Sequence, residues 1–144
     1  MINKMLHGDC LELMKDIPNG SIDMILCDLP YGTTQCKWDS VIPFEPLWKE
    51  YERIIKPNGA IVLTASQPFT SALIMSNINL FKYELIWEKS NPTGMGQANK
   101  RPMKYHENIS MKMFIHIFSF IVIFHSFLKR RLKSSSRSRI FILK

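Results

Sequence analysis

The chain has 144 residues, of which 46% are hydrophobic, 11% aromatic and 22% charged. This composition excludes a disordered or collagen-like chain, and the length leaves no room for two full α/β domains, so we expect one globular domain. The formal net charge is +7, but all 12 Asp and Glu residues fall between Asp9 and Glu107. Residues 1–109 carry 11 Lys and Arg against those 12 acids, whereas residues 110–144 carry 8 Lys and Arg and no acid.

Three cysteines, Cys10, Cys27 and Cys36, lack both the CxxC spacing and the nearby histidine that are typical of metal ligands. We therefore expect no metal site and interpret each cysteine as a small buried hydrophobe. The first 15 residues contain no apolar segment typical of a secretory signal. These features favour a reducing, cytoplasmic location.

Strand-like and helix-like segments alternate along residues 1–109, which predicts an α/β sheet with helical crossovers. Asp9 suits the N-cap of a short helix, and Glu12 stands where it would close a capping box. The apolar run Ile22–Cys27 predicts a strand covered on both faces. The further predicted elements are a helix over Phe44–Ile55, a turn at Lys56–Gly59, a strand over Ala60–Ala65, a helix over Pro68–Ser76, a strand over Lys82–Trp87 and a basic loop over Asn91–Tyr105.

The sequence changes in character from Ser110 onward. Met111–Leu128 is rich in Ile and Phe without helical amphipathicity or strand alternation, and Lys129–Arg139 is rich in Ser, Lys and Arg. Three interpretations stay open: a membrane helix over 111–128 with a cytoplasmic basic flank, a nucleic-acid-binding tail, and an out-of-frame segment never selected for folding. The loss of all acids beyond Glu107 favours the third.

An acid and a Pro-Tyr pair follow the first buried strand, in the order Asp28-Leu29-Pro30-Tyr31. In open α/β sheets, ligands bind at the carboxyl ends of the strands. A carboxylate acceptor, a turn held by proline and an aromatic face suit a planar base that bears an exocyclic amine. The alternative is structural: Asp28 caps the loop and Tyr31 covers the edge of the core.

Asp28–Tyr31 resembles the D-P-P-Y motif of the amino-group DNA methyltransferases, which methylate adenine N6 or cytosine N4 with S-adenosylmethionine. Further segments similar to this family are His7–Glu12, Gly32–Thr34, Lys37–Asp39, Ile55–Ala60, Ser66–Ser71, Trp87–Lys89, Arg101-Pro102 and His106–Ile109. The resemblance covers residues 1–109 and points to the group in which the catalytic motif precedes the cofactor motif, often carried by phages and restriction–modification systems. It implies a partial doubly wound, mainly parallel sheet of the S-adenosylmethionine-dependent methyltransferase type. Residues 1–109 would form the catalytic portion and 110–144 a basic tail.

The resemblance also implies a role for each residue of the motif. The Asp28 carboxylate and the Leu29 carbonyl would accept the hydrogens of the target amine, Pro30 would hold the turn, and Tyr31 would stack on a base flipped out of double-stranded DNA. Aspartate in the first position favours adenine N6 over cytosine N4.

Other candidate site residues have structural alternatives beside their functional interpretation. Asp9 is a candidate for the cofactor's adenine pocket, although its N-cap role also explains it. The candidate DNA contacts are Trp38, Lys89, Lys100, Arg101 and Lys104. The tryptophan could instead pack on the edge of the core, and the four cations could form an ordinary solvated surface.

Two features depart from the family pattern. Leu29 stands where the family usually has proline, which frees φ, adds an N–H donor and predicts a lower rate. The family's F-x-G-x-G cofactor loop has no match, and Thr93–Gly96 is interpreted as part of the basic loop. The sequence thus predicts a truncated site-specific DNA adenine-N6 methyltransferase of doubtful activity, with a bare sheet edge and marginal stability. The alternatives are a non-catalytic DNA-binding remnant and a membrane-attached protein.

Overall fold

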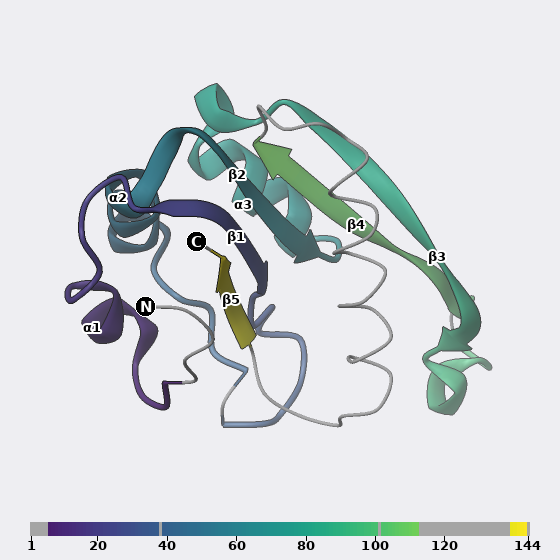
Figure 1. Cartoon of the computed structure of the whole chain (residues 1–144). Coiled ribbons are helices and arrows are strands. Elements are labelled where there is room, and N and C mark those ends of the chain that lie inside the picture. The colour runs from purple at the N-terminus through teal and green to yellow at the C-terminus, as the bar shows by residue number, and fades with distance from the viewer. Residues whose placement is uncertain (1–5, 38, 101, 113–138, 144) are drawn as a thin grey trace.

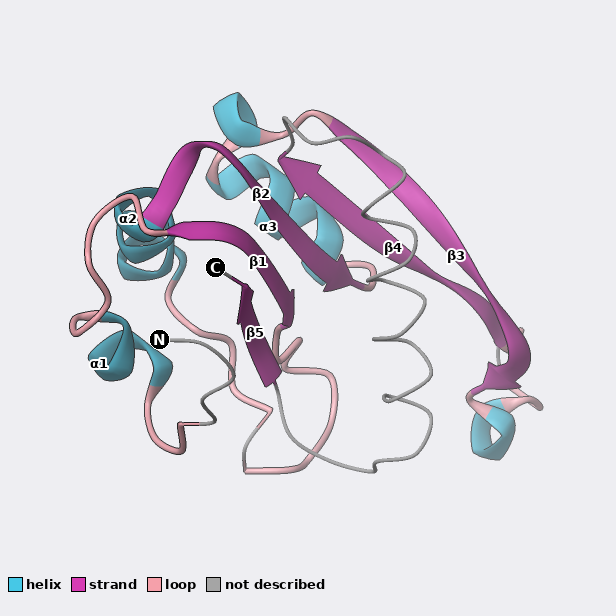
Figure 2. Cartoon of the chain, in the orientation of Figure 1, coloured by secondary structure: helices cyan, strands magenta, loops and turns pink. Residues whose placement is uncertain are grey.

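The computed structural model of the chain describes residues 6–37, 39–100, 102–112 and 139–143 (Figure 1). In chain order the elements are α1 (Cys10–Met14), β1 (Ile22–Asp28), α2 (Phe44–Ile54), β2 (Ile55–Ala65), α3 (Phe69–Ser76), the 3-10 helix η1 (Ile78–Leu80), β3 (Tyr83–Thr93), the 3-10 helix η2 (Met95–Gln97), β4 (Lys104–Lys112) and β5 (Arg139–Leu143). Figure 2 shows how these helices and strands follow one another along the chain. The elements predicted between residues 22 and 76 are present, with β2 beginning at Ile55 in place of the predicted turn.

The five described strands form one sheet in the order β3-β4-β2-β1-β5. Strands β1 and β2 are parallel, whereas the pairs β1–β5, β2–β4 and β3–β4 are antiparallel. The predicted α/β class is confirmed, but the described part of the sheet is mixed rather than mainly parallel. The connection from β3 to β4 is short and carries no crossover helix, so β4 can only return antiparallel to β3.

Strand β4 lies in a segment for which the sequence predicted no strand. Its residues Glu107, Asn108 and Ser110 are polar and yet buried, each at most 9% exposed. Two of them are paired across to β3, since Glu107 forms an ion pair with Lys89 and Asn108 donates a hydrogen bond to Glu84. Alternation of apolar and polar residues does not reveal a strand whose buried polar groups are satisfied by such distant partners.

The outer edge of β1 is covered in the described structure, contrary to the bare edge that the sequence predicted. Strand β5 pairs antiparallel with β1, from Met24 opposite Leu143 to Asp28 opposite Arg139. A free ladder of backbone groups favours pairing with any available extended segment. Most of the tail, including nearly all of Met111–Leu128 and Lys129–Arg139, lies outside the described residues, so the three interpretations of the tail stay predictions.

Within the residues that the structure describes, no helix is both long enough and apolar enough to span a membrane.

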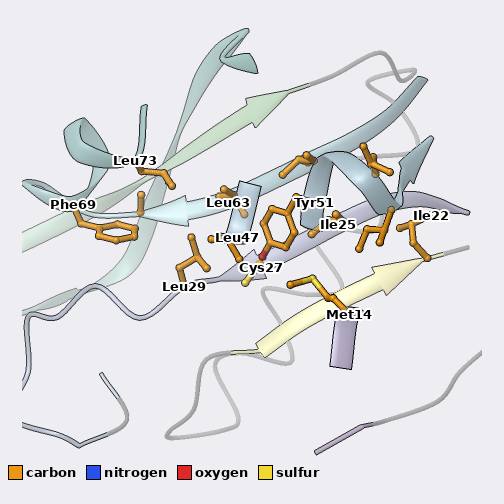
Figure 3. Packing of buried hydrophobic residues seen from close by; sticks show 14 residues of the cluster. Met14, Ile22, Ile25, Cys27, Leu29, Leu47, Tyr51, Leu63, Phe69 and Leu73 are labelled. Atoms are coloured by element: carbon orange, nitrogen blue, oxygen red, sulfur yellow. The ribbon is translucent and has the colours of Figure 1, made fainter. Parts of the chain in front are cut away.

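The hydrophobic core lies between the sheet and the helices α1, α2 and α3 (Figure 3). Helix α2 contributes Leu47, Tyr51 and Ile54, whose spacing of four and three residues places them on one helical face. The complete cluster is Met14, Ile22, Ile25, Cys27, Leu29, Leu47, Tyr51, Ile54, Ile55, Ile61, Leu63, Ala65, Phe69 and Leu73. Since Met24 and Leu26 are also buried, β1 is covered on both faces as predicted.

The cysteines occupy three different environments. Cys27 is buried, Cys10 is half-buried and Cys36 is exposed, and all three are free thiols. The interpretation as a buried hydrophobe is therefore confirmed for Cys27 and wrong for Cys36, which lies in the loop between β1 and α2, outside the core. Burial raises the pKa of the Cys27 thiol well above its ordinary value.

Candidate active site

The Asp28–Tyr31 segment lies where two parallel strands end. Asp28 is the last residue of β1 and stands opposite Thr64 of β2 in the register of the pair. Leu29 and Pro30 continue the chain as buried residues, and Tyr31 is half-buried. The motif therefore lies at the carboxyl edge of the sheet, as the sequence predicted.

Two hydroxyl groups converge on one oxygen of the Asp28 carboxylate. The Thr64 hydroxyl donates to Asp28 Oδ1 over 2.5 Å, and the Tyr31 hydroxyl donates to the same oxygen over 2.9 Å. The two hydroxyl oxygens are themselves 3.0 Å apart. Such charge-assisted hydrogen bonds are stronger than neutral ones and hold a carboxylate in a defined orientation.

Thr64 belongs to this site, although no motif in the sequence identifies it. It lies in the apolar run of β2, and its side chain is fully buried. The only signal in the sequence was a hydroxyl residue near the end of a buried strand. Its significance depends on the register between β1 and β2, which local sequence patterns do not define.

The Tyr31 ring packs against Phe69, which in turn packs against Phe44, on the helix side of the site. Its centroid lies 5.3 Å from that of Phe69 at an interplanar angle of 33°, and the Phe69 ring lies 5.7 Å from Phe44. Phe69 begins α3 and Phe44 begins α2. Two helix N-termini therefore support the ring that would stack on a base.

Asp39 organises the loop that follows Tyr31. Its carboxylate accepts hydrogen bonds from the backbone amides of Gly32, Thr33 and Thr34, at 2.9, 3.0 and 2.7 Å. Gly32 has a left-handed φ of +67°, and a Cβ there would lie 3.0 Å from Val41. Burial opposes the charged form of Asp39, but hydrogen bonds from the Thr34 side chain and the three amides outweigh it, so the pKa of Asp39 lies below its ordinary value.

Asp9, the candidate cofactor contact, is the N-cap of α1. Its Oδ1 accepts the Leu11 amide over 2.8 Å, which confirms the predicted cap. Glu12 forms an ion pair with Lys15 at 2.7 Å, where the sequence predicted a capping box. The Asp9 side chain is exposed, and its contact with a cofactor stays a prediction.

Of the five candidate DNA contacts, the structure describes Lys89, Lys100 and Lys104. Lys89 forms an ion pair with Glu107 at 2.5 Å, with these side chains only 12% and 9% exposed. Lys104 donates to the Ser66 hydroxyl just beyond the end of β2, whereas Lys100 is exposed in the connection between β3 and β4. Trp38 and Arg101 lie outside the described residues.

Leu29 has a role in packing that its place in the motif did not suggest. Its side chain is 4% exposed and belongs to the core cluster beside Cys27, as Figure 3 shows. The leucine therefore fills part of the core next to the site. Proline, which the family usually has at this position, would fill less of this space because its side chain is smaller.

Comparison with known proteins agrees with this geometry. The type II methyltransferase M.HinfI of Haemophilus influenzae is 32% identical over 117 aligned residues, which cover 63% of this chain and 33% of that protein. The crystal structure of the M1.HpyAVI–SAM complex matches with a TM-score of 0.52 and 23% identity, covering 81% of this chain and 58% of that one. The cytosine-N4-specific PvuII DNA methyltransferase matches with a TM-score of 0.59 and 18% identity, covering 78% and 49%. No family model matches the chain.

The fold is that of the S-adenosylmethionine-dependent methyltransferases. Within that class, the relatives in sequence are type II DNA methyltransferases, and the predicted resemblance to the amino-group DNA methyltransferases of restriction–modification systems is confirmed. The chain spans about a third of the length of M.HinfI.

Proposed function

We propose that this chain takes part in methyl transfer from S-adenosylmethionine to the exocyclic amine of a base in double-stranded DNA, with adenine N6 as the favoured target. The observation that carries the proposal is the position of Asp28 and Tyr31 at the carboxyl end of β1, in a fold shared with DNA methyltransferases. The similarity to M.HinfI supports the same reaction.

The residues of this chain suit the amine side of the reaction. The lone pair of an aromatic amine is delocalised into the base, which makes the nitrogen a poor nucleophile. The Asp28 carboxylate and the Leu29 carbonyl would accept the two N–H groups and turn the lone pair out of the ring plane, while Tyr31 stacks on the base. S-adenosylmethionine, when bound, supplies an electrophilic methyl group on a sulfonium sulfur.

The described residues include the groups proposed to bind the target amine, but few groups that could bind S-adenosylmethionine. The strand on the outer side of β1, away from β2, is β5 (Arg139–Leu143), which contains no glycine, and no described segment provides an F-x-G-x-G loop. Asp9 is the one candidate contact to the cofactor, and its Oδ1 already caps α1. We therefore assign the described residues to binding and orienting the base.

The choice of base is the finer part of the proposal. An acid at position 28, where other members of the family have serine, favours adenine N6. Mass spectrometry of the nucleosides released from DNA after incubation with the full chain and S-adenosylmethionine would distinguish the products. N6-methyladenine is expected, and N4-methylcytosine would contradict the choice of adenine.

Asp28→Asn tests the chemistry of the site. It keeps the shape of the side chain but removes its charge, and we expect it to lower the rate of methyl transfer by about 100-fold or more. Asp23→Asn is the matched control, since Asp23 lies in the same strand and pairs with Lys56 at a half-exposed site. Equal rates for Asp28→Asn and the parent would contradict the role of Asp28. A folded chain that binds DNA without transferring methyl groups would support the non-catalytic alternative.

A further inference from the structure

Thr64 connects β2 to the one side chain on which the proposed reaction most depends. The Thr64 hydroxyl donates to Asp28 Oδ1 over 2.5 Å, and Thr64 is 0% exposed. The neighbouring residues of β2 are Leu63 and Ala65, both buried in the core cluster. A fully buried hydroxyl is costly unless it is hydrogen-bonded, and Asp28 provides that partner.

The two hydroxyl groups on Asp28 differ in how firmly they are held. Tyr31 lies beyond the end of β1 and is half-buried, so its hydroxyl depends on the geometry of a loop. Thr64 lies within β2, and the parallel register places it directly opposite Asp28. A group supported by a strand orients its partner more accurately than a group on a loop.

We propose that Thr64 is a positioning residue whose hydroxyl holds the Asp28 carboxylate in the orientation that accepts the hydrogens of the target amine. This inference rests on the proposed function, because it assigns a role in recognising the amine of the base. The Thr64 hydroxyl restricts rotation of the carboxylate about its Cβ–Cγ bond. Thr64 itself is buried and makes no contact with the base.

The test measures how well the full chain distinguishes a base with the amine from one without it. Two short DNA duplexes are compared, identical except that the base placed opposite an abasic site is adenine in one and unsubstituted purine in the other. Affinities are measured by NMR titration of the Tyr31 ring signals. We expect the parent chain to bind the adenine oligonucleotide about tenfold more tightly, the effect of one well-placed hydrogen bond to a charged acceptor.

Thr64→Val should reduce this ratio to about one, because valine has nearly the same shape but no hydroxyl. Thr64→Ser should restore the ratio, since serine keeps the donor. Thr70→Val is the matched control: Thr70 is 1% exposed, and its hydroxyl has no hydrogen-bond partner among the described residues. That control should keep the parent ratio. If Thr64→Val does not fold, as judged by circular dichroism, Thr64→Ala takes its place with the same expected result.

The possible failures are distinguishable. A parent-like ratio in Thr64→Val would overturn the positioning role and leave the proposed function intact. A parent chain that binds both oligonucleotides equally would contradict recognition of the amine, and would overturn the proposed function together with this inference. A loss of discrimination in Thr70→Val equal to that in Thr64→Val would attribute the effect to general loosening of the core and also overturn the positioning role.

Discussion

Asp39 stabilises the site without contacting the base in the proposed reaction. Three successive amides of the loop after Tyr31 donate to its carboxylate, which is 7% exposed. In the sequence, Asp39 is distinguished only as part of a segment similar to the family. Its role depends on how residues 32–39 fold back on themselves, which the local pattern does not reveal.

The stability of the chain should depend on pH through Asp39. Its pKa is lowered in the folded state, so its contribution is present above the ordinary pKa of about 3.9 and is lost as the pH falls through the lower folded value. Asp39→Asn should lower the free energy of unfolding by about 1–3 kcal/mol at neutral pH. The difference from the parent should narrow below about pH 4. Urea unfolding over this range measures it, and a difference independent of pH would contradict the role of the charge.

Lys89, which the sequence predicts as a DNA contact, forms contacts within the β3–β4 pair. The register places Trp87 opposite Glu107 and Glu88 opposite His106, so Lys89 lies two residues beyond Trp87 and its ammonium group reaches Glu107 diagonally across the two strands. Lys89 Nζ also lies 5.9 Å from the centre of the Trp87 ring. These contacts favour the structural interpretation of Lys89 over contact with phosphate.

Lys89→Met should therefore affect stability more than DNA binding. The substitution removes the cation that pairs with the nearly buried Glu107 carboxylate, and we expect a loss of about 3–5 kcal/mol in the free energy of unfolding. Lys15→Met is a suitable comparison, because the Lys15–Glu12 pair is exposed to solvent and its loss should lower the free energy of unfolding far less. Chemical denaturation measures both variants. A Lys89→Met chain of parental stability would show that the pair is not a structural contact.

The distribution of charge along the chain bears on which residues could contact the phosphates of the proposed DNA partner. The net charge of +7 comes from the basic residues beyond Glu107, since residues 1–109 are nearly neutral. Of the candidate DNA contacts that the structure describes, Lys100 is exposed, whereas Lys89 and Lys104 are engaged with Glu107 and Ser66. Lys100 is thus the described candidate best suited to contact a phosphate.

The affinity of the full chain for double-stranded DNA should fall steeply as the salt concentration rises, because bound cations are released from the phosphates. Lys100→Ala should reduce the slope of log affinity against log salt by about 1, without a change in stability. Fluorescence anisotropy with a labelled duplex provides the measurement, and Lys15→Ala at the C-cap of α1 serves as the control. An unchanged slope in Lys100→Ala would exclude Lys100 from the contact.

Local patterns in the sequence are sufficient to predict the elements between residues 22 and 76 and to place Asp28–Tyr31 at the end of a strand. Apolar runs, helical spacing and Pro-Gly turns are local signals, and they are sufficient to define β1, α2, the buried part of β2 and α3. The D-x-P-Y motif in its ordered context likewise identified the methyltransferase family.

Which residues meet at the site depends on contacts between segments that are distant in the chain. The register of β1 against β2 places Thr64 on Asp28, and the insertion of β4 between β3 and β2 buries Lys89 against Glu107. The pairing of β5 with β1 similarly joins residues more than 100 positions apart. Such contacts depend on long-range pairing and on polar groups that become satisfied only when distant segments come together, and no local pattern in the chain encodes them.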